Sequence, residues 1–513
     1  MLILSSCIIL LINAVTIRHD KTMSHNRITT IILLYSTFLA FDSLHIPCIE
    51  KGIGIFGGLF LVTSVTQNFV VFIFIISFLI LQLIAFFPRR LEGLGAHFIP
   101  VKENNLKILR NAIISPGAII DFPIIIIFII VGAVCLMSSC DLITMFLCLE
   151  LQSYGLYILA AIYRNSELAT SAGLTYFLLG GTNLSTMIHN FDISLLILSV
   201  GYLFKVSSAP FHFWSPDVYD SLPTIVTTFV AIMAKISLFI FLFELVNNIS
   251  GAKTLFTWTD ILLISSLFSL IVGTIVGLVQ KRIKRLFAYS TISHVGFILL
   301  ALIVNTVESI QAYFFYIIQY SLSNLNFFII IISVGHFLIY FNGQYYWRLN
   351  DRWNSPLQLI LQLKGFFYKN YMLSLSLAIT LLSFAGIPPL LGFFGKQMVL
   401  SAALAKGYYF MTLIAIITSV IGAVYYLFIL KIVFFDNNED TVHPLFQRYF
   451  NEWKYYSLSK KEKDRILKEK NRLLSTSLAL MISTLTLGIL LFVLWPSILI
   501  CNAGTLAYIS FNP

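Results

Sequence analysis

Four charged side chains lie in stretches of the sequence that are otherwise apolar over the length of a membrane span. Glu150 and Lys235 are near the centres of two such stretches, and Lys205 and Lys396 lie beside helix-breaking residues. An ion at that depth costs about 3 kcal/mol even on lenient insertion scales, so intramembrane charges usually mark a path for ions or protons. These residue types therefore predict proton transfer inside a membrane.

Two of these lysines accompany a break in a predicted membrane helix. The first break follows Lys205, where FKVSSAPFHFW places two serines and Pro210 inside an apolar segment. The second is LSFAGIPPLLGFFGK, in which Gly386 and two prolines precede Lys396. Proline has no N–H to donate and its ring clashes with the preceding turn, so backbone carbonyls are freed at membrane depth. Transporters build their ion sites at broken helices of this kind.

A pair formed by Glu150 and Lys205 would have two protonation states. Burial favours the neutral form of an ionisable group, whereas an opposite charge nearby favours the charged form. A lysine whose carboxylate partner approaches or withdraws can accept a proton from one side and pass it on. The alternative is a static buried ion pair that fixes the register of two helices. Lys235 and Lys396 have no obvious carboxylate partner, and we expect neutral or water-solvated relay sites there.

His294 is a candidate relay between these sites. It lies in the middle of a span, in AYSTISHVGFILL, with three hydroxyl side chains close by. It would extend a hydrated polar track, and the alternative is a histidine hydrogen-bonded within the bundle. Asp217 and Asp220 follow the first break, where we expect capping and turn roles. The basic cluster KRIKR at 281–285 is expected to orient the span that follows it.

The elements that position these residues are membrane helices. The chain has 513 residues, of which 58% are hydrophobic and 11% charged, whereas ordinary soluble domains carry about a quarter charged residues. This composition predicts an all-α polytopic membrane protein. Candidate spans lie at about 1–17, 28–46, 53–87, 118–137, 141–163, 168–190, 192–213, 221–247, 260–280, 283–304, 308–341, 370–402, 407–430 and 473–500.

The distribution of positive charge supports about 14 transmembrane helices. With that number, the loops after odd-numbered spans share one side and hold 27 of the 33 Lys and Arg. Positive loops stay on the side of synthesis, so even the weak sixth span is expected to cross. Topology thus explains the net charge of +10 without a nucleic acid partner. The first span begins almost at Met1 without a basic leader, which favours synthesis beside the membrane in a bacterium or an organelle.

The two breaks lie five spans apart, so the two copies insert in opposite senses, as in the inverted repeats of transporters. Residues 1–117 are expected to form helices 1–3 and a basic connector. Residues 118–250 form the first antiporter-like repeat, helices 4–8, and residues 251–434 form the second, helices 9–13. Residues 435–513 form a charged loop and the C-terminal helix 14. The six cysteines lack a CxxC pair, and we expect core residues rather than metal ligands.

The chain resembles the NADH-ubiquinone oxidoreductase chain 2 family, the mitochondrially encoded antiporter-like subunits of respiratory complex I, and most of all its fungal members. The resemblance extends from about Asp141 to Lys431. It is most specific in four blocks, ELQSYGLYIL from Glu150, FKVSSAPFHFWSPDVYDSLPTIVTTFVAIMAKIS from Phe204, KRIKRLFAYSTISHVGFILLAL from Lys281 and FAGIPPLLGFFGKQMVLSAAL from Phe384. It differs at the sixth helix, which is longer in related chains.

The resemblance implies two inverted five-helix repeats in a multi-pass subunit of the mitochondrial inner membrane. It implies proton pumping driven by electron transfer from NADH to ubiquinone in other subunits, which hold the NAD, FMN, iron–sulfur and ubiquinone sites. No cofactor or metal is expected on this chain, and its expected partners are other membrane-arm subunits and lipids. By position, Glu150, Lys205, Lys235 and Lys396 match the family's charged residues of helices 5, 7, 8 and 12.

Two other functions fit the same residues. A bacterial-type cation/proton antiporter complex would use this fold with an ion gradient in place of NADH, and it predicts sodium/proton exchange without NADH. A structural spacer with an inactive polar track would tolerate replacement of all four buried charges.

Overall fold

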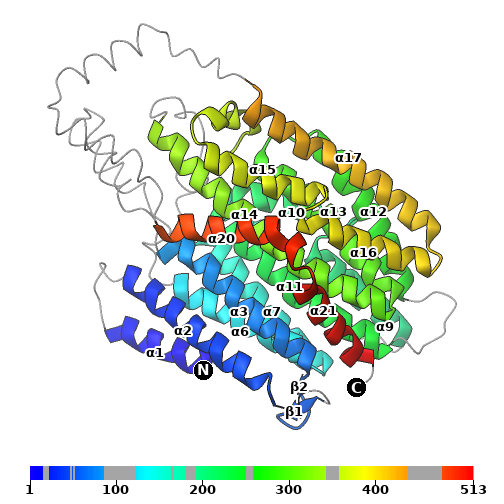
Figure 1. Ribbon diagram of the computed structural model, residues 1–513. Helices are drawn as coiled ribbons and strands as arrows, with labels where there is room; N and C mark the ends of the chain where they lie inside the picture. Colours follow the sequence, from blue (N-terminus) through cyan, green and yellow to red (C-terminus); the bar gives the residue numbers. More distant parts are fainter. Residues whose placement is uncertain are drawn as a thin grey trace, which may run out of the picture.

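The computed structural model describes residues 1–15, 22–46, 49, 52–85, 122–162, 167–180, 191–249, 258–341, 357–436 and 476–511. The described residues form a bundle of long helices that run side by side (Figure 1). We call the end of the bundle that carries residues 281–285 the basic end. The predicted basic connector at 88–114 and nearly all of the charged loop at 435–472 lie outside the described residues.

The N-terminal helices pack together at one side of the bundle (Figure 1). They are α1 (Leu2–Val15), α2 (Thr22–Ser43) and α3 (Ser64–Ala85). Residues predicted to begin the third span instead form a hairpin of β1 (Ile53–Ile55) and β2 (Phe60–Val62), paired antiparallel. Gly57 and Gly58 make this turn with positive φ angles, a conformation that glycine adopts without steric cost. The prediction of a span from residue 53 is therefore wrong for its first ten residues.

The first predicted repeat begins with three helices, α6 (Phe122–Ser138), α7 (Leu142–Ala161) and α8 (Glu167–Gly180). Gly132 lets α6 and α7 approach closely, because an added Cβ there would lie 2.7 Å from the backbone nitrogen of Gln152. Small residues permit such close packing where the lipid offers no hydrophobic drive for association. The sixth predicted span is described only to Gly180.

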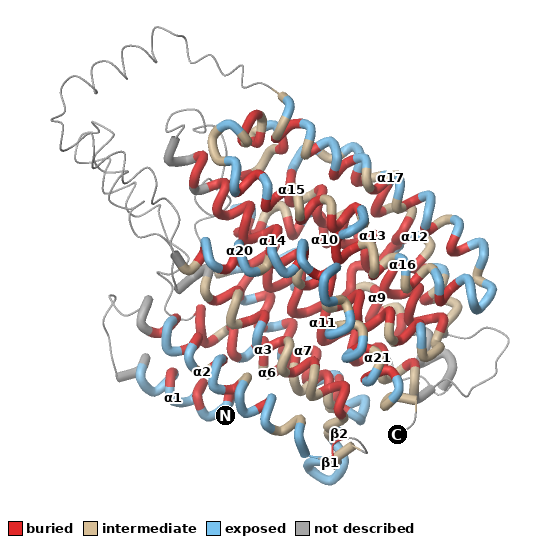
Figure 2. The backbone as a smooth tube through the Cα atoms, in the orientation of Figure 1, coloured by how far each residue is buried: buried red, intermediate tan, exposed pale blue. Residues whose placement is uncertain are grey.

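Three helices form the centre of the bundle, α11 (Thr224–Ile249), α13 (Ile283–Val304) and α14 (Val307–Phe341). Every residue of the apolar window in α11 is buried, compared with 33% of the window in the outer helix α17 (Tyr409–Phe434). Figure 2 shows the same gradient from a buried centre to exposed outer faces. Side chains on α11, α13 and α14 therefore meet other protein groups rather than lipid.

Both predicted breaks are present. The first separates α9 (Phe191–Val206) from the short α10 (Trp214–Ser221), and the second separates α15 (Tyr371–Ala385) from α16 (Leu391–Ala405). α12 (Trp258–Leu278) packs on α13, where Gly273 lies against the Ser293 backbone nitrogen, 2.6 Å from a Cβ built there. Two 3-10 turns, Ile360–Leu363 and Phe366–Tyr368, precede α15.

The C-terminal segment contains a third interruption that was not predicted. The expected single helix is divided into α20 (Thr476–Leu491), a 3-10 turn (Phe492–Leu494) and α21 (Ser497–Phe511). Pro496 stands directly before α21, a position where its missing N–H removes no helical hydrogen bond.

Among the described residues, eight helices are long and apolar enough to cross a membrane, and five shorter helices are also apolar. The count of 14 crossings stays a prediction. The division into two inverted repeats also stays a prediction.

Candidate functional site

Glu150 and Lys205 lie together, which is the arrangement that the ion-pair hypothesis requires. The Lys205 Nζ atom is 3.5 Å from Glu150 Oε1, and the two side chains are only 10% and 15% exposed. Lys205 Nζ also donates a hydrogen bond of 2.9 Å to Ser153 Oγ. Glu150 and Ser153 are three residues apart on α7, so one face of that helix supplies both partners of the lysine.

At the break after Lys205, the backbone carbonyls accept hydrogen bonds that are not regular α-helical bonds. Ser207 adopts a left-handed φ of 64°. Ser208 satisfies the Leu203 carbonyl twice, through its backbone N–H at 3.0 Å and its hydroxyl at 3.1 Å. Trp214 Nε1 donates to the Phe204 carbonyl at 2.9 Å. Carbonyls freed by the break are thus paired, and Lys205 is held at the end of α9.

A cavity of about 20 Å³ lies beside Lys205. Its polar lining includes Gln152 and Ser153, and Ala234 and Leu238 of α11 also line it. A space of this size holds about one water molecule. Gln152 and Ser237 exchange hydrogen bonds of 2.9 and 3.1 Å, which join α7 to α11 at this level.

Lys235 is buried on α11, with 2% of its surface exposed. Its Nζ atom donates to Thr291 Oγ1 at 3.3 Å and lies 5.9 Å from the centre of the Tyr219 ring. An ammonium at that distance from an aromatic face is attracted by the ring quadrupole. Among the described groups that contact it, Lys235 has a hydroxyl and a ring.

His294 lies one turn beyond Thr291 on the same face of α13. Its Nδ1 atom is 2.8 Å from the Tyr316 hydroxyl, and its Nε2 atom is 3.4 Å from the Tyr426 hydroxyl. Thr291 is the hydrogen-bond partner of Lys235, and the His294 ring lies 5.5 Å from the ring of Phe384, whose carbonyl accepts a hydrogen bond from Lys396. His294 therefore occupies the space between the two lysines, with a hydroxyl at each ring nitrogen.

Lys396 turns back into the second break. Its Nζ atom donates hydrogen bonds of 2.9 Å to the carbonyls of Phe384 and Ala385, the last residues of α15. Gly386 makes room for this contact, because a Cβ there would lie 2.9 Å from Lys396 Cδ. The carbonyls freed by the break, which the sequence predicted, are thus the partners of the lysine.

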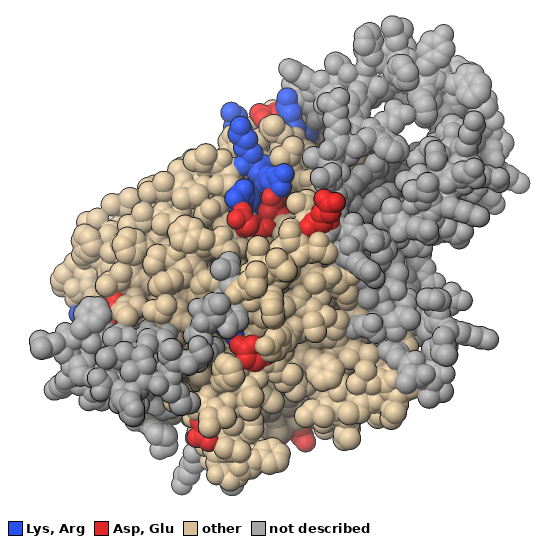
Figure 3. Space-filling view, turned by 180° about the vertical axis from the view of Figure 1, so that it is seen from behind, with Lys and Arg blue, Asp and Glu red and all other residues tan. Residues whose placement is uncertain are grey.

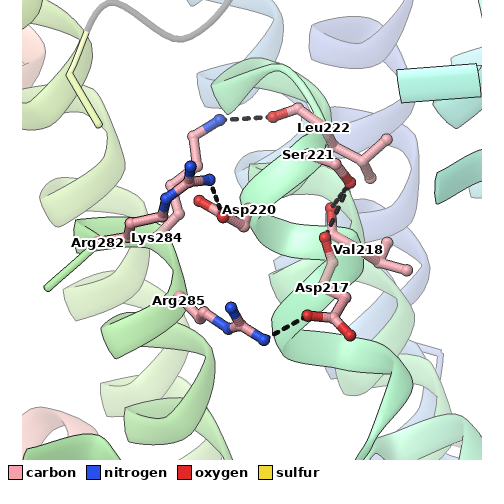
Figure 4. A network of polar contacts seen from close by, with 8 residues as sticks. All are labelled: Asp217, Val218, Asp220, Ser221, Leu222, Arg282, Lys284 and Arg285. Atoms are coloured by element: carbon pink, nitrogen blue, oxygen red, sulfur yellow. Dashed lines mark hydrogen bonds and ion pairs between the residues drawn. The ribbon is translucent and has the colours of Figure 1, made fainter. Parts of the chain in front are cut away.

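The basic cluster links α10 to the start of α13 (Figure 4). Arg282 pairs with Asp220 at 2.5 Å and Arg285 pairs with Asp217 at 2.6 Å. The buried Lys284 donates to the Leu222 carbonyl at 2.5 Å. On the face shown in Figure 3, the blue basic side chains gather in one patch with acidic side chains beside them. The cluster therefore fastens the second half of the broken helix, beyond the orienting role expected of it.

One half-buried acidic residue of a candidate membrane span, Glu244, was not predicted to matter. Glu244 is on α11, near its hairpin end, and its carboxylate interacts with the Thr63 side chain beside β2. Its position close to the end of a predicted span concealed it, since charges there usually reach the membrane surface. Its partner Thr63 is about 180 residues away in the sequence, so no local pattern could indicate the contact.

Among the described residues, no group of three or more His, Cys, Asp or Glu is placed to hold a metal ion. Cys148 is buried and Cys135 is half-buried, whereas Cys7, Cys140 and Cys501 are exposed. The expectation of core positions is wrong for these last three. Cys7 and Cys501 lie on the outer helices α1 and α21, and Cys140 lies in the junction between α6 and α7.

Comparison with known proteins decides the family. A family model described as "NADH:quinone oxidoreductase/Mrp antiporter, TM" matches residues 139–189 and 181–422. NADH-ubiquinone oxidoreductase chain 2 of Rhizopus oryzae is 47% identical over 439 residues, which cover 80% of this chain and 81% of that protein. The chain belongs to the NADH-ubiquinone oxidoreductase chain 2 family. NADH-quinone oxidoreductase subunit N 1 of Acidiphilium cryptum is 34% identical, over 62% of this chain and 69% of that protein.

Solved structures share the fold of this chain 2 family member. A chain of respiratory complex I from Thermus thermophilus superposes with a TM-score of 0.69 at 23% identity, covering 98% of this chain and 97% of that one. A chain of the Mrp complex from Dietzia gives 0.71 at 15% identity, covering 99% and 95%. The predicted helical, antiporter-like membrane fold is confirmed. The roles assigned to the individual site residues stay predictions.

Proposed function

We propose that the chain is a proton-translocating subunit in the membrane arm of respiratory complex I. The observation that supports this most is the contact of Lys205 with Glu150 at 3.5 Å beside a broken helix. At this depth, movement of one partner shifts the protonation equilibrium of the other, and gain or loss of a proton then changes the charge of the pair, which a fixed apolar core cannot do. The relatives' names supply the source of energy, NADH oxidation coupled to quinone reduction.

The proton path runs through the polar groups in order. Lys205 holds a proton while Glu150 is ionised and near, and releases it when that stabilisation weakens. The small cavity and the Gln152–Ser237 contact lead toward Lys235. Thr291 and His294 continue the path along α13, with the hydroxyls of Tyr316 and Tyr426 at the histidine ring. Lys396 ends the series at the second break.

The location that fits this function is the mitochondrial inner membrane, with the basic end of the bundle on the matrix side. The fungal and plant relatives named chain 2 support this location. The partners are other membrane-arm subunits and lipids. The NAD, FMN, iron–sulfur and ubiquinone chemistry belongs to other subunits, so this chain takes part in the enzyme without a redox centre of its own.

Replacing Lys205 tests the proposal. In Lys205→Met the ammonium is lost but the length of the side chain is nearly kept, so the complex should assemble. We expect NADH-driven acidification of sealed vesicles to fall by about tenfold or more, the scale of losing a positioned proton-transfer group. Lys281→Met is the matched control, because Lys281 is exposed at the basic end. Unchanged pumping in an assembled Lys205→Met complex would refute the proposed role.

The alternative function, a cation/proton antiporter, is supported only by the shared fold with the Mrp complex chain. At 15% identity this similarity shows the fold and not the activity. It predicts sodium/proton exchange in vesicles that receive no NADH. Exchange under that condition, together with pumping that does not depend on NADH, would replace the complex I proposal.

A further inference from the structure

Two cysteines contact each other across neighbouring helices, and the proton path above uses neither of them. Cys135 is on α6 and Cys148 is on α7, and both are free thiols. Their side chains share a hydrogen bond. A thiol is only a weak donor and a weak acceptor, so this contact adds little to stability. It does bring two sulfur atoms together.

The close packing of α6 on α7 holds this pair in place. A Cβ built on Gly132 would lie 2.7 Å from the Gln152 nitrogen, and a Cβ built on Gly155 would lie 2.5 Å from Ile129 Cγ1. As the residue number rises on α6 it falls on α7, so the two helices run antiparallel. The two cysteines come one turn beyond Gly132 and Gln152 along this shared register. Glycine contacts therefore fix the position in which the thiols face each other.

The two thiols differ in how far they are exposed. Cys148 is 7% exposed, whereas Cys135 is half-buried. Phe128, Val131 and Cys135 are spaced three and four residues apart, so they share one partly exposed face of α6. This face is apolar and belongs to an apolar helix, so it meets lipid rather than water. Cys135 is therefore the thiol that a molecule dissolved in the bilayer reaches first.

An accessible thiol beside a buried one is an arrangement that oxidation converts into a disulfide. The accessible cysteine forms a sulfenic acid, and a neighbouring thiol condenses with it. A disulfide needs Cβ atoms about 4 Å apart, a separation that the close packing of α6 on α7 favours. The oxidant must be apolar, because the accessible thiol lies on a lipid-facing surface. Lipid hydroperoxides combine an O–O bond with solubility in the bilayer.

We propose that Cys135 and Cys148 form a redox-sensitive dithiol that lipid hydroperoxides oxidise to a disulfide between α6 and α7. The Cys135 sulfur attacks the terminal peroxide oxygen, the O–O bond breaks, and the thiol proton leaves on the lipid alcohol. The Cys148 sulfur then attacks the Cys135 sulfenic acid, and the S–O bond breaks to release water. Two thiols and one hydroperoxide thus become one disulfide, one lipid alcohol and one water molecule.

The disulfide joins α6 to the helix that carries the partners of Lys205. Cys148 is two residues before Glu150 on α7, and Ser153 follows less than one turn later. In the oxidised state this part of α7 is held covalently on α6, and reduction releases it. The modification requires only the two thiols and a lipid oxidant, so it does not rest on the proposed function.

Oxidation of the assembled complex in lipid vesicles tests the proposal without any variant. The vesicles contain a fatty-acid hydroperoxide, the remaining thiols are alkylated after denaturation, and the cysteine peptides are identified by mass spectrometry. We expect a peptide pair joined through Cys135 and Cys148 that separates on reduction. Vesicles containing the corresponding hydroxy fatty acid are the control, in which both cysteines should be alkylated. Alkylation of both cysteines after hydroperoxide treatment would overturn the proposal.

Single substitutions test the role of each thiol. In Cys148→Ser the reaction should stop at a sulfenic acid on Cys135, which a dimedone reagent traps. In Cys135→Ser we expect Cys148 to remain a thiol. Cys140→Ser is the matched control, because Cys140 is exposed in the junction between the two helices, and the disulfide should form there as in the unmodified chain. A disulfide that includes Cys140, or a missing Cys135–Cys148 link in Cys140→Ser, would overturn the proposal.

A trivalent arsenical separates the contact of the thiols from their oxidation. Phenylarsine oxide binds two neighbouring thiols at once, and we expect it to protect Cys135 and Cys148 from alkylation in the unmodified chain but not in either single variant. Failure to protect the pair would overturn the contact. Protection by the arsenical without oxidation by the hydroperoxide would overturn the modification. None of these measurements uses pumping, so the result for Lys205→Met bears on the proposed function alone.

Discussion

Each buried lysine of the path has a different kind of partner. Lys205 has a carboxylate and a hydroxyl, Lys235 has a hydroxyl and a ring face, and Lys396 has two backbone carbonyls. Among the described contacts of these three lysines, an opposite full charge occurs at Lys205, so movement of Glu150 there shifts the protonation equilibrium of the lysine. The other two lysines contact dipoles that are fixed in the backbone or in packed side chains.

The fit of Lys396 depends on a single glycine. Gly386→Ala would force a side chain into a left-handed φ of 83° and place its Cβ 2.9 Å from Lys396 Cδ. The left-handed backbone conformation costs a residue other than glycine about 1 kcal/mol. The added Cβ also displaces the Lys396 ammonium from the carbonyls of Phe384 and Ala385. We expect slower NADH-driven pumping with the complex still assembled. Gly488→Ala on α20 is the control, because nothing lies within 4 Å of its added Cβ. Equal pumping in the two variants would contradict this account.

At the residue level, the sequence predicted the charged members of the site and left out the uncharged ones. Glu150 and the three lysines stand out because charge is rare in apolar spans. Ser153 and Thr291 reach their lysines through contacts across more than 50 residues of sequence, which no local pattern encodes.

At the scale of elements, the second half of the broken helix is held by three contacts of unequal strength. The pairs of Asp217 with Arg285 and of Asp220 with Arg282 are partly exposed, and such pairs contribute about 0–1 kcal/mol. Lys284 is buried, and its ammonium satisfies the carbonyl at the end of α10. Removing it leaves a polar group without that partner, which costs more than loss of a surface pair.

We therefore expect Lys284→Met to lower the unfolding temperature of the purified complex, through a loss of about 1–3 kcal/mol. Asp217→Asn should change it much less, since Asp217 is 70% exposed. Thermal unfolding in detergent at low and high salt measures both. A larger effect from Asp217→Asn than from Lys284→Met would show that the surface pair, and not the buried ammonium, fastens α10.

The two breaks followed from the prolines inside apolar spans, whereas the interruption at Pro496 and the strand pairing at 53–62 did not follow from the sequence. Both breaks at α9–α10 and α15–α16 were predicted from local chemistry. The hairpin at 53–62 was not, because its strands are as apolar as a membrane span and only their pairing makes them strands. Gly57 and Gly58 were the residues of that segment that could have indicated a turn.

For the whole molecule, the one-sided distribution of positive charge predicts which end faces which compartment. Lys281 is exposed at the basic end, and Phe56 is exposed at the tip of the hairpin. In a chain whose six native cysteines are replaced by serine, we expect Lys281→Cys to react with a membrane-impermeant thiol reagent only from the matrix side. Phe56→Cys should react only from the other side. Labelling of both cysteine variants from the same side would contradict the proposed topology.

The ring stack next to Lys205 gives the chain a built-in optical probe. Trp214 lies flat between Tyr176 and Phe204, with ring centres 4.8 and 5.9 Å away. Indole emission shifts with the local electric field, and this indole is fixed by its hydrogen bond to the residue preceding Lys205. Turnover should therefore produce a spectral change that disappears in Trp214→Phe, so that charging of a single buried lysine becomes visible in real time without an added dye.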